Sequence, residues 1–384
     1  MRPIHYRVTS TNVTSMVVSH VQQALGLVDF GTRVWAHLLA QLLIAASIRR
    51  GSLSAACQDR CGLPSDETIR RALRANLPDD IAELEQQLAS QLVTHVPRDI
   101  YRRPRPLAID LTLIPFYGDP KTPGLFRGQA KQGTKYFWAF ATCVIVRHGQ
   151  RLTLGLVRVT SPGSLEKVIG QLLEQAAVWG VRPAYLLLDR GFYSAKVIGW
   201  LQEQELKFVM PMIRRGRKPD HPQGPTGTQV FFVPGRYGFG EHHWTGKRDR
   251  SKVTVSVAMV PHGRRAPLVY VFHGLNYSLN WYAQTYRRRF GIESSYRQLR
   301  QGLARTTTCD PRWRLMMVAL ALILRNFWVL LHWSTISDVR RGGRQFRFAL
   351  LRVHRFFEWL RWAVDRWLPP KLEIFTQRPM PQPL

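Results

Sequence analysis

The chain has 384 residues, and its 55 Lys and Arg outnumber 25 Asp and Glu to give a formal net charge of +30 at pH 7. Hydrophobic residues make up 45% of it, which excludes a disordered polycation, because such a chain has too little apolar surface to bury. An excess of positive charge this large is typical of proteins that bind polyanions. We therefore expect nucleic acid as the partner before an anionic membrane.

Two apolar runs, 34–48 and 315–333, approach the length of a membrane-spanning helix. The second run carries Arg325 and Asn326, and a span needs about 20 largely apolar residues without a central charge. We therefore expect two buried helices and no membrane partner. The N-terminal residues lack the apolar run of a secretory signal, and the four cysteines lack metal-ligand spacing. These features predict a cytoplasmic, nucleoid-associated protein with free thiols.

The first 100 residues carry apolar side chains at helical spacing and predict an all-α, DNA-binding region. After a Gly-Leu-Pro break, Ser65 is a candidate N-cap for a helix over 67–77 that carries three arginines. A helix, a short turn and a basic second helix resemble a helix-turn-helix, and an ordinary helical hairpin with solvated arginines fits equally well. A Pro- and Arg-rich stretch over 97–106 then predicts a domain boundary.

Asp110 lies in the segment 107–113, where Leu and Ile recur at every second position. This pattern predicts a strand with Asp110 on the face opposite the apolar residues. The next segments predict two strands, a helix and a short strand, over 135–147, 151–159, 164–179 and 184–188. Asp189 stands at the end of the last strand, and another helix follows. This order is that of a ribonuclease-H-like fold, in which the first and fourth strands lie side by side. We therefore expect Asp110 and Asp189 to meet in space.

The pattern changes after this core, because short apolar strands separated by Pro and Gly predict a β-rich insertion. Helical spacing then returns and continues to a basic C-terminal helix. The fold class we predict is α/β, with a ribonuclease-H-like catalytic core interrupted by the insertion, an all-α N-terminal region and a helical C-terminal region. The expected domains are the N-terminal region, the first part of the core, the insertion, the second part of the core and the C-terminal region, over 1–100, 101–205, 206–276, 277–335 and 336–384.

A further motif lies later in the chain and consists of Tyr286, Arg289, Glu293 and Arg300. On a helix with 100° per residue, these four side chains fall within one sector of roughly 60°. A carboxylate flanked by cations suits a site in which an acid holds a metal ion while cations bind phosphates. The alternative is a surface ion-pair ladder, with Arg289 and Glu293 paired at i, i+4. Gly291 also weakens the helix prediction at this point.

Taken together, these motifs resemble the DDE transposases of the insertion sequence four group. The second motif of that group is an aspartate followed by Gly-Phe, which matches Asp189-Arg190-Gly191-Phe192. Its third motif is Tyr-x2-Arg-x3-Glu-x6-Lys, in which Arg300 replaces the final lysine here. A guanidinium is a planar fork and an ammonium a point charge, so the role of position 300 stays open.

The resemblance implies a metal-dependent DNA transposase in which Asp110, Asp189 and Glu293 are catalytic and bind two Mg²⁺ or Mn²⁺ ions. Such an enzyme cleaves double-stranded DNA at the element ends, in related enzymes through a hairpin, and transfers the freed 3′-hydroxyl into target DNA. A homodimer in the synaptic complex is also implied. The residues expected to contact DNA are Tyr286, Arg289, Arg297, Arg300, Arg190, Lys131, Lys135, Trp244, Arg214 and Arg215.

Some of these assignments have simpler alternatives. Trp244 is the candidate for stacking on a flipped base, and a core position inside the insertion is its alternative. For the whole chain, the alternatives are an inactive transposase-derived DNA-binding protein, a ribonuclease-H-like nuclease without strand transfer, and a basic structural RNA-binding protein. The last of these does not need carboxylates at strand ends.

Overall fold

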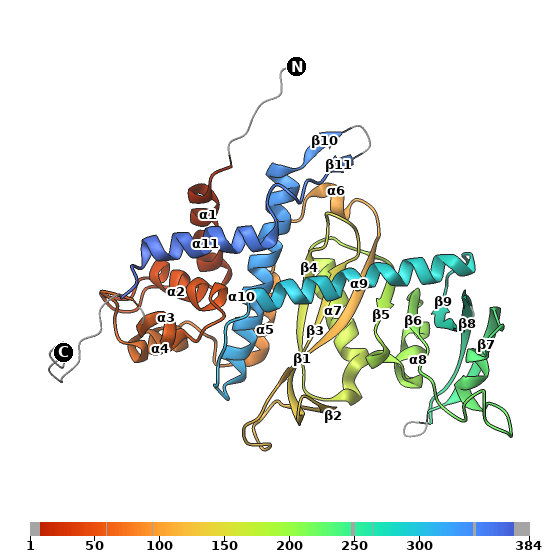
Figure 1. The fold of residues 1–384 in the computed structure, drawn as a ribbon. Coiled ribbons are helices and arrows are strands. Elements are labelled where there is room, and N and C mark those ends of the chain that lie inside the picture. The colour runs from red at the N-terminus through yellow and green to blue at the C-terminus, as the bar shows by residue number, and fades with distance from the viewer. Residues whose placement is uncertain are drawn as a thin grey trace, which may run out of the picture. The chain divides into compact units, whose positions relative to one another are not determined.

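The structure is a computed structural model that describes residues 8–58, 60–93, 95–246, 250–263, 265–340 and 343–371. For 290–299 and 343 it describes the backbone alone. The chain divides into two compact units (Figure 1). One combines Met1–Leu84 with Leu299–Leu384, and the other comprises Glu85–Gln298. Each unit has its own core and is considered separately.

The unit formed from the two ends of the chain is mainly helical. Its helices are α1 (Ser10–Ala24), α2 (Ala36–Ile48), α3 (Leu53–Gln58), α4 (Asp66–Ala75), α10 (Pro311–Leu331) and α11 (Val353–Trp367), and α5 (Ile81–Ser90) begins in it. One π-helical turn (His332–Ile336) and a hairpin of β10 (Asp338–Arg340) and β11 (Gly343–Gln345) follow α10. Within the described part of the chain, one helix, Pro311–Ile336, has the length and composition of a membrane span. Of its most apolar window, 94% is buried inside the protein, as in a core helix.

The basic helix predicted near the N-terminus is α4. The Ser65 hydroxyl accepts a hydrogen bond from the Thr68 backbone N–H at 3.3 Å, which confirms the predicted N-cap. The helix ends at Ala75, two residues before the predicted end. Arg70 forms an ion pair with Asp66 at 2.5 Å, so this arginine stabilises the helix itself. The other two arginines of the helix, at positions 71 and 74, are exposed.

A mixed sheet forms the centre of the second unit. Its strand order is β2-β3-β1-β5-β6-β9-β8-β7, with β4 also paired to β3. The strands are β1 (Arg105–Pro115), β2 (Phe126–Lys131), β3 (Thr134–Ile145), β4 (Thr153–Val159), β5 (Pro183–Leu188), β6 (Phe208–Pro211), β7 (Gly238–Thr245), β8 (Lys252–His262) and β9 (Arg265–His273). As predicted, β1 and β5 are adjacent, and β3 and β4 are antiparallel. The pairing of β1 with β5 is parallel. The segment 206–276 contains β6 to β9, which continue the same sheet.

Helix was expected where β10 and β11 form a hairpin, and the edge strand β2 was not predicted. Its sequence, Phe-Arg-Gly-Gln-Ala-Lys, has no apolar alternation, because four of its six residues are exposed and only Phe126 is buried. An edge strand of this kind is held by its backbone hydrogen bonds to β3, and these leave no pattern in the side chains.

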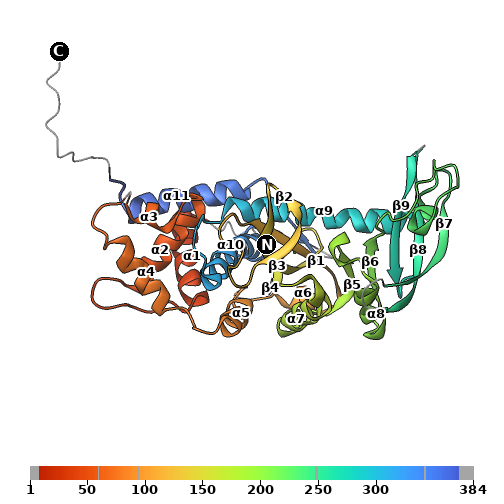
Figure 2. The same ribbon diagram turned by 90° about the horizontal axis from the view of Figure 1, so that it is seen from below.

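Helices cover both faces of this sheet (Figure 2). On one face lie α7 (Leu165–Val178), which packs on β3 and β4, and α8 (Ala195–Glu203), which packs on β8. The first half of α9 (Leu279–Gln301) covers the other face. A short helix, α6 (Arg98–Tyr101), precedes β1.

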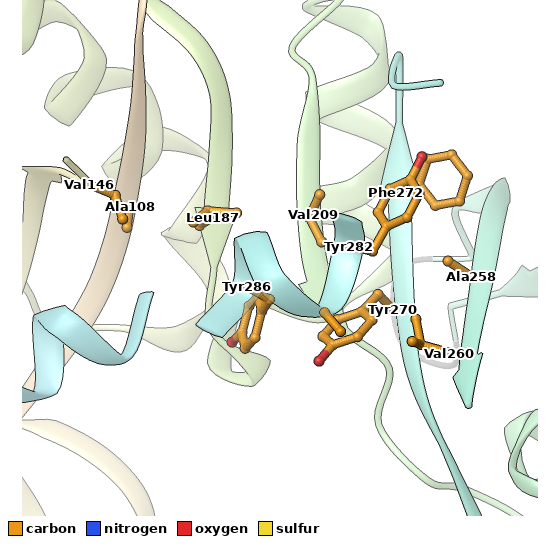
Figure 3. Packing of buried hydrophobic residues seen from close by; sticks show 11 residues of the cluster. Ala108, Val146, Leu187, Val209, Ala258, Val260, Tyr270, Phe272, Tyr282 and Tyr286 are labelled. Carbon is orange, nitrogen blue, oxygen red and sulfur yellow. The ribbon is translucent and has the colours of Figure 1, made fainter. Parts of the chain in front are cut away.

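Aromatic side chains fix α9 on the sheet (Figure 3). Tyr282 is fully buried, and its ring lies 4.5 Å from that of Phe272 in β9. Tyr286 is 6% exposed, and its ring lies 5.3 Å from that of Tyr270. These rings belong to an apolar cluster with Ala108 and Leu187, among others. Because the helix is held at two successive turns, the residues that follow Tyr286 are brought to the middle of β1 and the end of β5.

Candidate active site

The two predicted aspartates come together at the adjacent strands β1 and β5. Ile109 of β1 is in register with Leu188 of β5, so the next residue of each chain segment is an aspartate. Side chains alternate between the faces of a strand. Asp110 and Asp189 therefore share the face of Ala108 and Leu187, which is the face covered by α9. The expectation that the two acids meet in space is confirmed.

Arg289 of α9 joins the two acids. Its Nη2 atom donates to Asp110 Oδ1 at 2.9 Å and lies 3.4 Å from Asp189 Oδ1. Arg289 is 5% exposed and Asp110 is 7% exposed, whereas the Asp189 side chain is 40% exposed. The site is therefore closed around Asp110 and open to solvent at Asp189. The described ion pairs of Arg289 are with Asp110 of β1 and with Asp189 in the turn after β5.

Tyr286 ties the helix to the end of β5. Its hydroxyl donates a hydrogen bond to the backbone carbonyl of Leu188 at 3.3 Å. Its ring centre lies 5.6 Å from the guanidinium carbon of Arg289. Burial raises the pKa of Tyr286. The charge of Arg289 opposes this rise, and the charges of Asp189 and Asp110 add to it, so the hydroxyl keeps its proton at neutral pH and remains a donor. Tyr286 thus positions Arg289 relative to the end of β5.

Burial raises the pKa of Asp110 to about 6. The positive charge of Arg289 and the Leu111 N–H, which donates to Oδ1 at 2.9 Å, oppose this rise, while the charge of Asp189 adds to it. The net direction means that the ionised carboxylate is under-compensated by its surroundings. A second cation at this position would satisfy it.

The donor set fits a divalent metal ion in its chemistry. Carboxylate oxygens are the ligands that Mg²⁺ and Mn²⁺ prefer, and here two carboxylates already share one cationic nitrogen. Among the side chains that the structure describes, no group of three or more His, Cys, Asp or Glu could hold a metal. The predicted third acid, Glu293, lies one helical turn after Arg289 in α9, and its side chain is outside the described residues.

The other predicted DNA-contacting residues lie in several places. Lys131 ends β2 and Lys135 lies in β3, and both are exposed. Arg190 starts the 3₁₀ turn after Asp189 and is exposed, as is Arg300 near the end of α9. The Arg297 side chain lies outside the described residues.

A cavity of about 810 Å³ is lined in part by Tyr193, which follows Asp189 closely in the chain. The sequence did not predict Tyr193 as a site residue. Tyr193 is 3% exposed, and its hydroxyl has no hydrogen-bond partner in the described part of the chain. Trp244 of β7 stacks on it with ring centres 4.9 Å apart, and the Arg215 guanidinium lies 5.6 Å from the Tyr193 ring centre. Trp244 is therefore half-buried on a cavity wall and not in the core. Arg214 is exposed and lies over Phe232.

Further residues of this cavity also escaped the sequence analysis. His242 lies 5.2 Å from Trp244 between ring centres, and Lys196 forms an ion pair with the buried Glu166. The period-two pattern of β7 could have indicated that His242 and Trp244 share a face. No local pattern connects them with Tyr193, which reaches the cavity from the turn after β5.

Comparison with known proteins agrees with this geometry. The model of one protein family, described as a transposase DDE domain, matches residues 101–327. No curated protein matches the chain. A cryo-EM structure of the piggyBac transposase synaptic complex with hairpin DNA is similar, with a TM-score of 0.51 and 13% sequence identity, covering 92% of this chain and 77% of that chain. At this identity the likeness concerns the fold alone, and it confirms the predicted α/β, ribonuclease-H-like class.

Proposed function

We propose that this chain is a cut-and-paste transposase of an insertion-sequence element. The chain belongs to the transposase DDE domain family, whose model matches residues 101–327. Its catalytic acids are Asp110, Asp189 and Glu293. The observation that carries this proposal is the meeting of Asp110 and Asp189 from adjacent parallel strands on Arg289 of α9. The Tyr286, Arg289 and Glu293 spacing further supports membership of the insertion sequence four group.

The three acids would hold two Mg²⁺ or Mn²⁺ ions. Such ions, when bound, supply Lewis-acid activation and charge stabilisation at the scissile phosphate. Asp110 supports this assignment, because burial raises its pKa and an added cation favours the ionised form. Asp189 lies at the solvent-accessible side of the pair, where a DNA strand can approach. Tyr286 holds α9 at the end of β5 through its hydrogen bond to the Leu188 carbonyl, so the acids keep their spacing while DNA binds.

Double-stranded DNA is the proposed partner, both as element ends and as target. The net charge of +30 supports it, since each phosphate neutralised by Lys or Arg releases a counterion. The proposed contacts are Tyr286, Arg289, Arg297, Arg300, Arg190, Lys131, Lys135, Arg214 and Arg215. Pairing of two ends would make the working form a homodimer in the cytoplasm, on the nucleoid.

The cavity beside Tyr193 is proposed to take a base turned out of the duplex. Its supporting features are the stacked pair of Trp244 and Tyr193, the nearby Arg215 guanidinium and an unsatisfied buried hydroxyl. A base needs an aromatic face and polar groups for its edge, and the backbone phosphate needs a cation.

A cleavage assay tests the proposed function. Labelled duplexes from the two flanks of the gene are incubated with protein and Mg²⁺ or Mn²⁺, alongside the variants Asp189→Ala and Asp119→Ala. Asp119 is an exposed loop acid, so its variant removes a carboxylate without touching the site. Cuts at discrete flank positions that need metal and Asp189, and that persist without Asp119, are expected. Scattered cuts in any DNA indicate a plain nuclease, and binding without cuts indicates an inactive descendant.

A further inference from the structure

We propose that Arg289 is a built-in counter-ion that occupies the position between Asp110 and Asp189 before a metal arrives. Loading of the acids with a divalent ion then requires its guanidinium to leave, and a DNA phosphate is the group that receives it. This inference rests on the proposed function for the identity of the acids as metal ligands. It adds that metal binding and DNA binding are coupled through one side chain.

The geometry is that of a bridging cation. A single nitrogen, Nη2, is 2.9 Å from an oxygen of Asp110 and 3.4 Å from an oxygen of Asp189. A metal ion held by both acids would be drawn to the same two carboxylates that already share this nitrogen. Two cations drawn to one pair of oxygens repel each other strongly where burial lowers the dielectric, and Arg289 and Asp110 are both buried.

Arg289 cannot relieve this competition by losing its proton. A guanidinium stays charged in proteins, so the side chain has to move or share its partners. It also cannot be left without a partner, because an unpaired buried charge is costly. The displaced guanidinium therefore needs another anion, and a phosphate accepts two parallel N–H bonds from arginine. The exposed side of the pair, at Asp189, is where such a phosphate has access.

Reciprocal coupling follows from this exchange. A phosphate that binds Arg289 frees the acids for metal, and a metal on the acids frees Arg289 for phosphate. The protein would accordingly hold metal weakly until DNA is in place, which limits cleavage by enzyme that has not engaged its substrate. If Arg289 is instead a fixed structural partner of the acids, its removal weakens metal binding or leaves it unchanged.

The test is a Mn²⁺ titration of the full-length, metal-stripped protein without DNA, followed by electron paramagnetic resonance. Arg289→Met is compared with Arg288→Met, which removes the same charge from the neighbouring exposed position of α9. We expect Arg289→Met to bind Mn²⁺ about tenfold more tightly than Arg288→Met, a typical coupling factor. Arg289→Lys keeps a cation and should stay close to wild type. Equal or weaker binding by Arg289→Met overturns the inference.

Two further measurements separate this inference from the proposed function. Asp189→Ala should abolish Mn²⁺ binding, and if binding survives, the metal assignment and the inference both fail. If Asp189→Ala abolishes binding but Arg289→Met does not tighten it, the inference alone fails. If Arg289→Met does not fold, the same question can be answered with the wild-type protein.

A short duplex should lower the apparent Mn²⁺ dissociation constant of the wild-type protein about tenfold, after correction for Mn²⁺ bound by the duplex itself. No change on adding the duplex counts against the coupling.

Discussion

Replacing Asp110 by asparagine should stabilise the metal-free protein at neutral pH. The pKa of this carboxyl rises from 3.8 in an unfolded chain to about 6 in the folded protein, chiefly through burial. A folded-state pKa above the unfolded value means that the folded protein holds a proton which the unfolded chain has released. The stability contributed by the protonated acid is therefore complete below pH 3.8 and is lost as the pH rises through 6.

The size of the effect follows from the shift. A change of about 2 pKa units corresponds to roughly 3 kcal/mol, at about 1.4 kcal/mol per unit. The amide of Asp110→Asn does not ionise. The free energy of unfolding of this variant should therefore exceed that of wild type by near zero at pH 4 and by roughly 3 kcal/mol at pH 7.5. Its cleavage activity should be absent, because the neutral amide is a poor metal ligand.

Urea denaturation in EDTA at pH 4.5, 6 and 7.5, followed by tryptophan fluorescence, measures this difference. Asp119→Asn, in an exposed loop, serves as the matched control and should follow the wild-type pH profile. An Asp110→Asn protein that is less stable than wild type at pH 7.5 would refute the reasoning. That result would mean that the ion pair with Arg289 outweighs the burial of the carboxylate.

Substitutions at three other positions test the parts that hold and extend the site. Tyr282→Ala should cost about 3–5 kcal/mol in urea denaturation, because it empties a fully buried ring position under α9, whereas Tyr282→Phe should cost about 1 kcal/mol. Tyr286→Phe loses the hydrogen bond to the Leu188 carbonyl and should cost about 1 kcal/mol in the same assay; no change would mean that this contact does not fix the helix. Trp244→Ala should weaken DNA binding by about 1–3 kcal/mol, measured by fluorescence anisotropy in an Asp189→Ala background. Unchanged affinity would exclude base stacking by this ring.

The sequence by itself determined the local elements and the chemistry that they carry. Alternating leucines and isoleucine predicted β1 and put Asp110 on a defined face, because side chains alternate along a strand. The short apolar run before Asp189 predicted β5. The order of strands and helices then predicted that the two acids would meet, which the register of β1 and β5 confirms.

The tertiary structure decided what depends on contacts between distant segments. Arg289 reads locally as half of an i, i+4 pair with Glu293, yet its described partners are Asp110 and Asp189, far away in the chain. Edge strand β2 and the cavity lined by Tyr193 and Trp244 also lack a local signal, since backbone pairing and ring stacking leave no periodicity. Periodicity reports which face of an element is buried. Which other element covers that face, and which charge meets which, is settled only when the segments pack together.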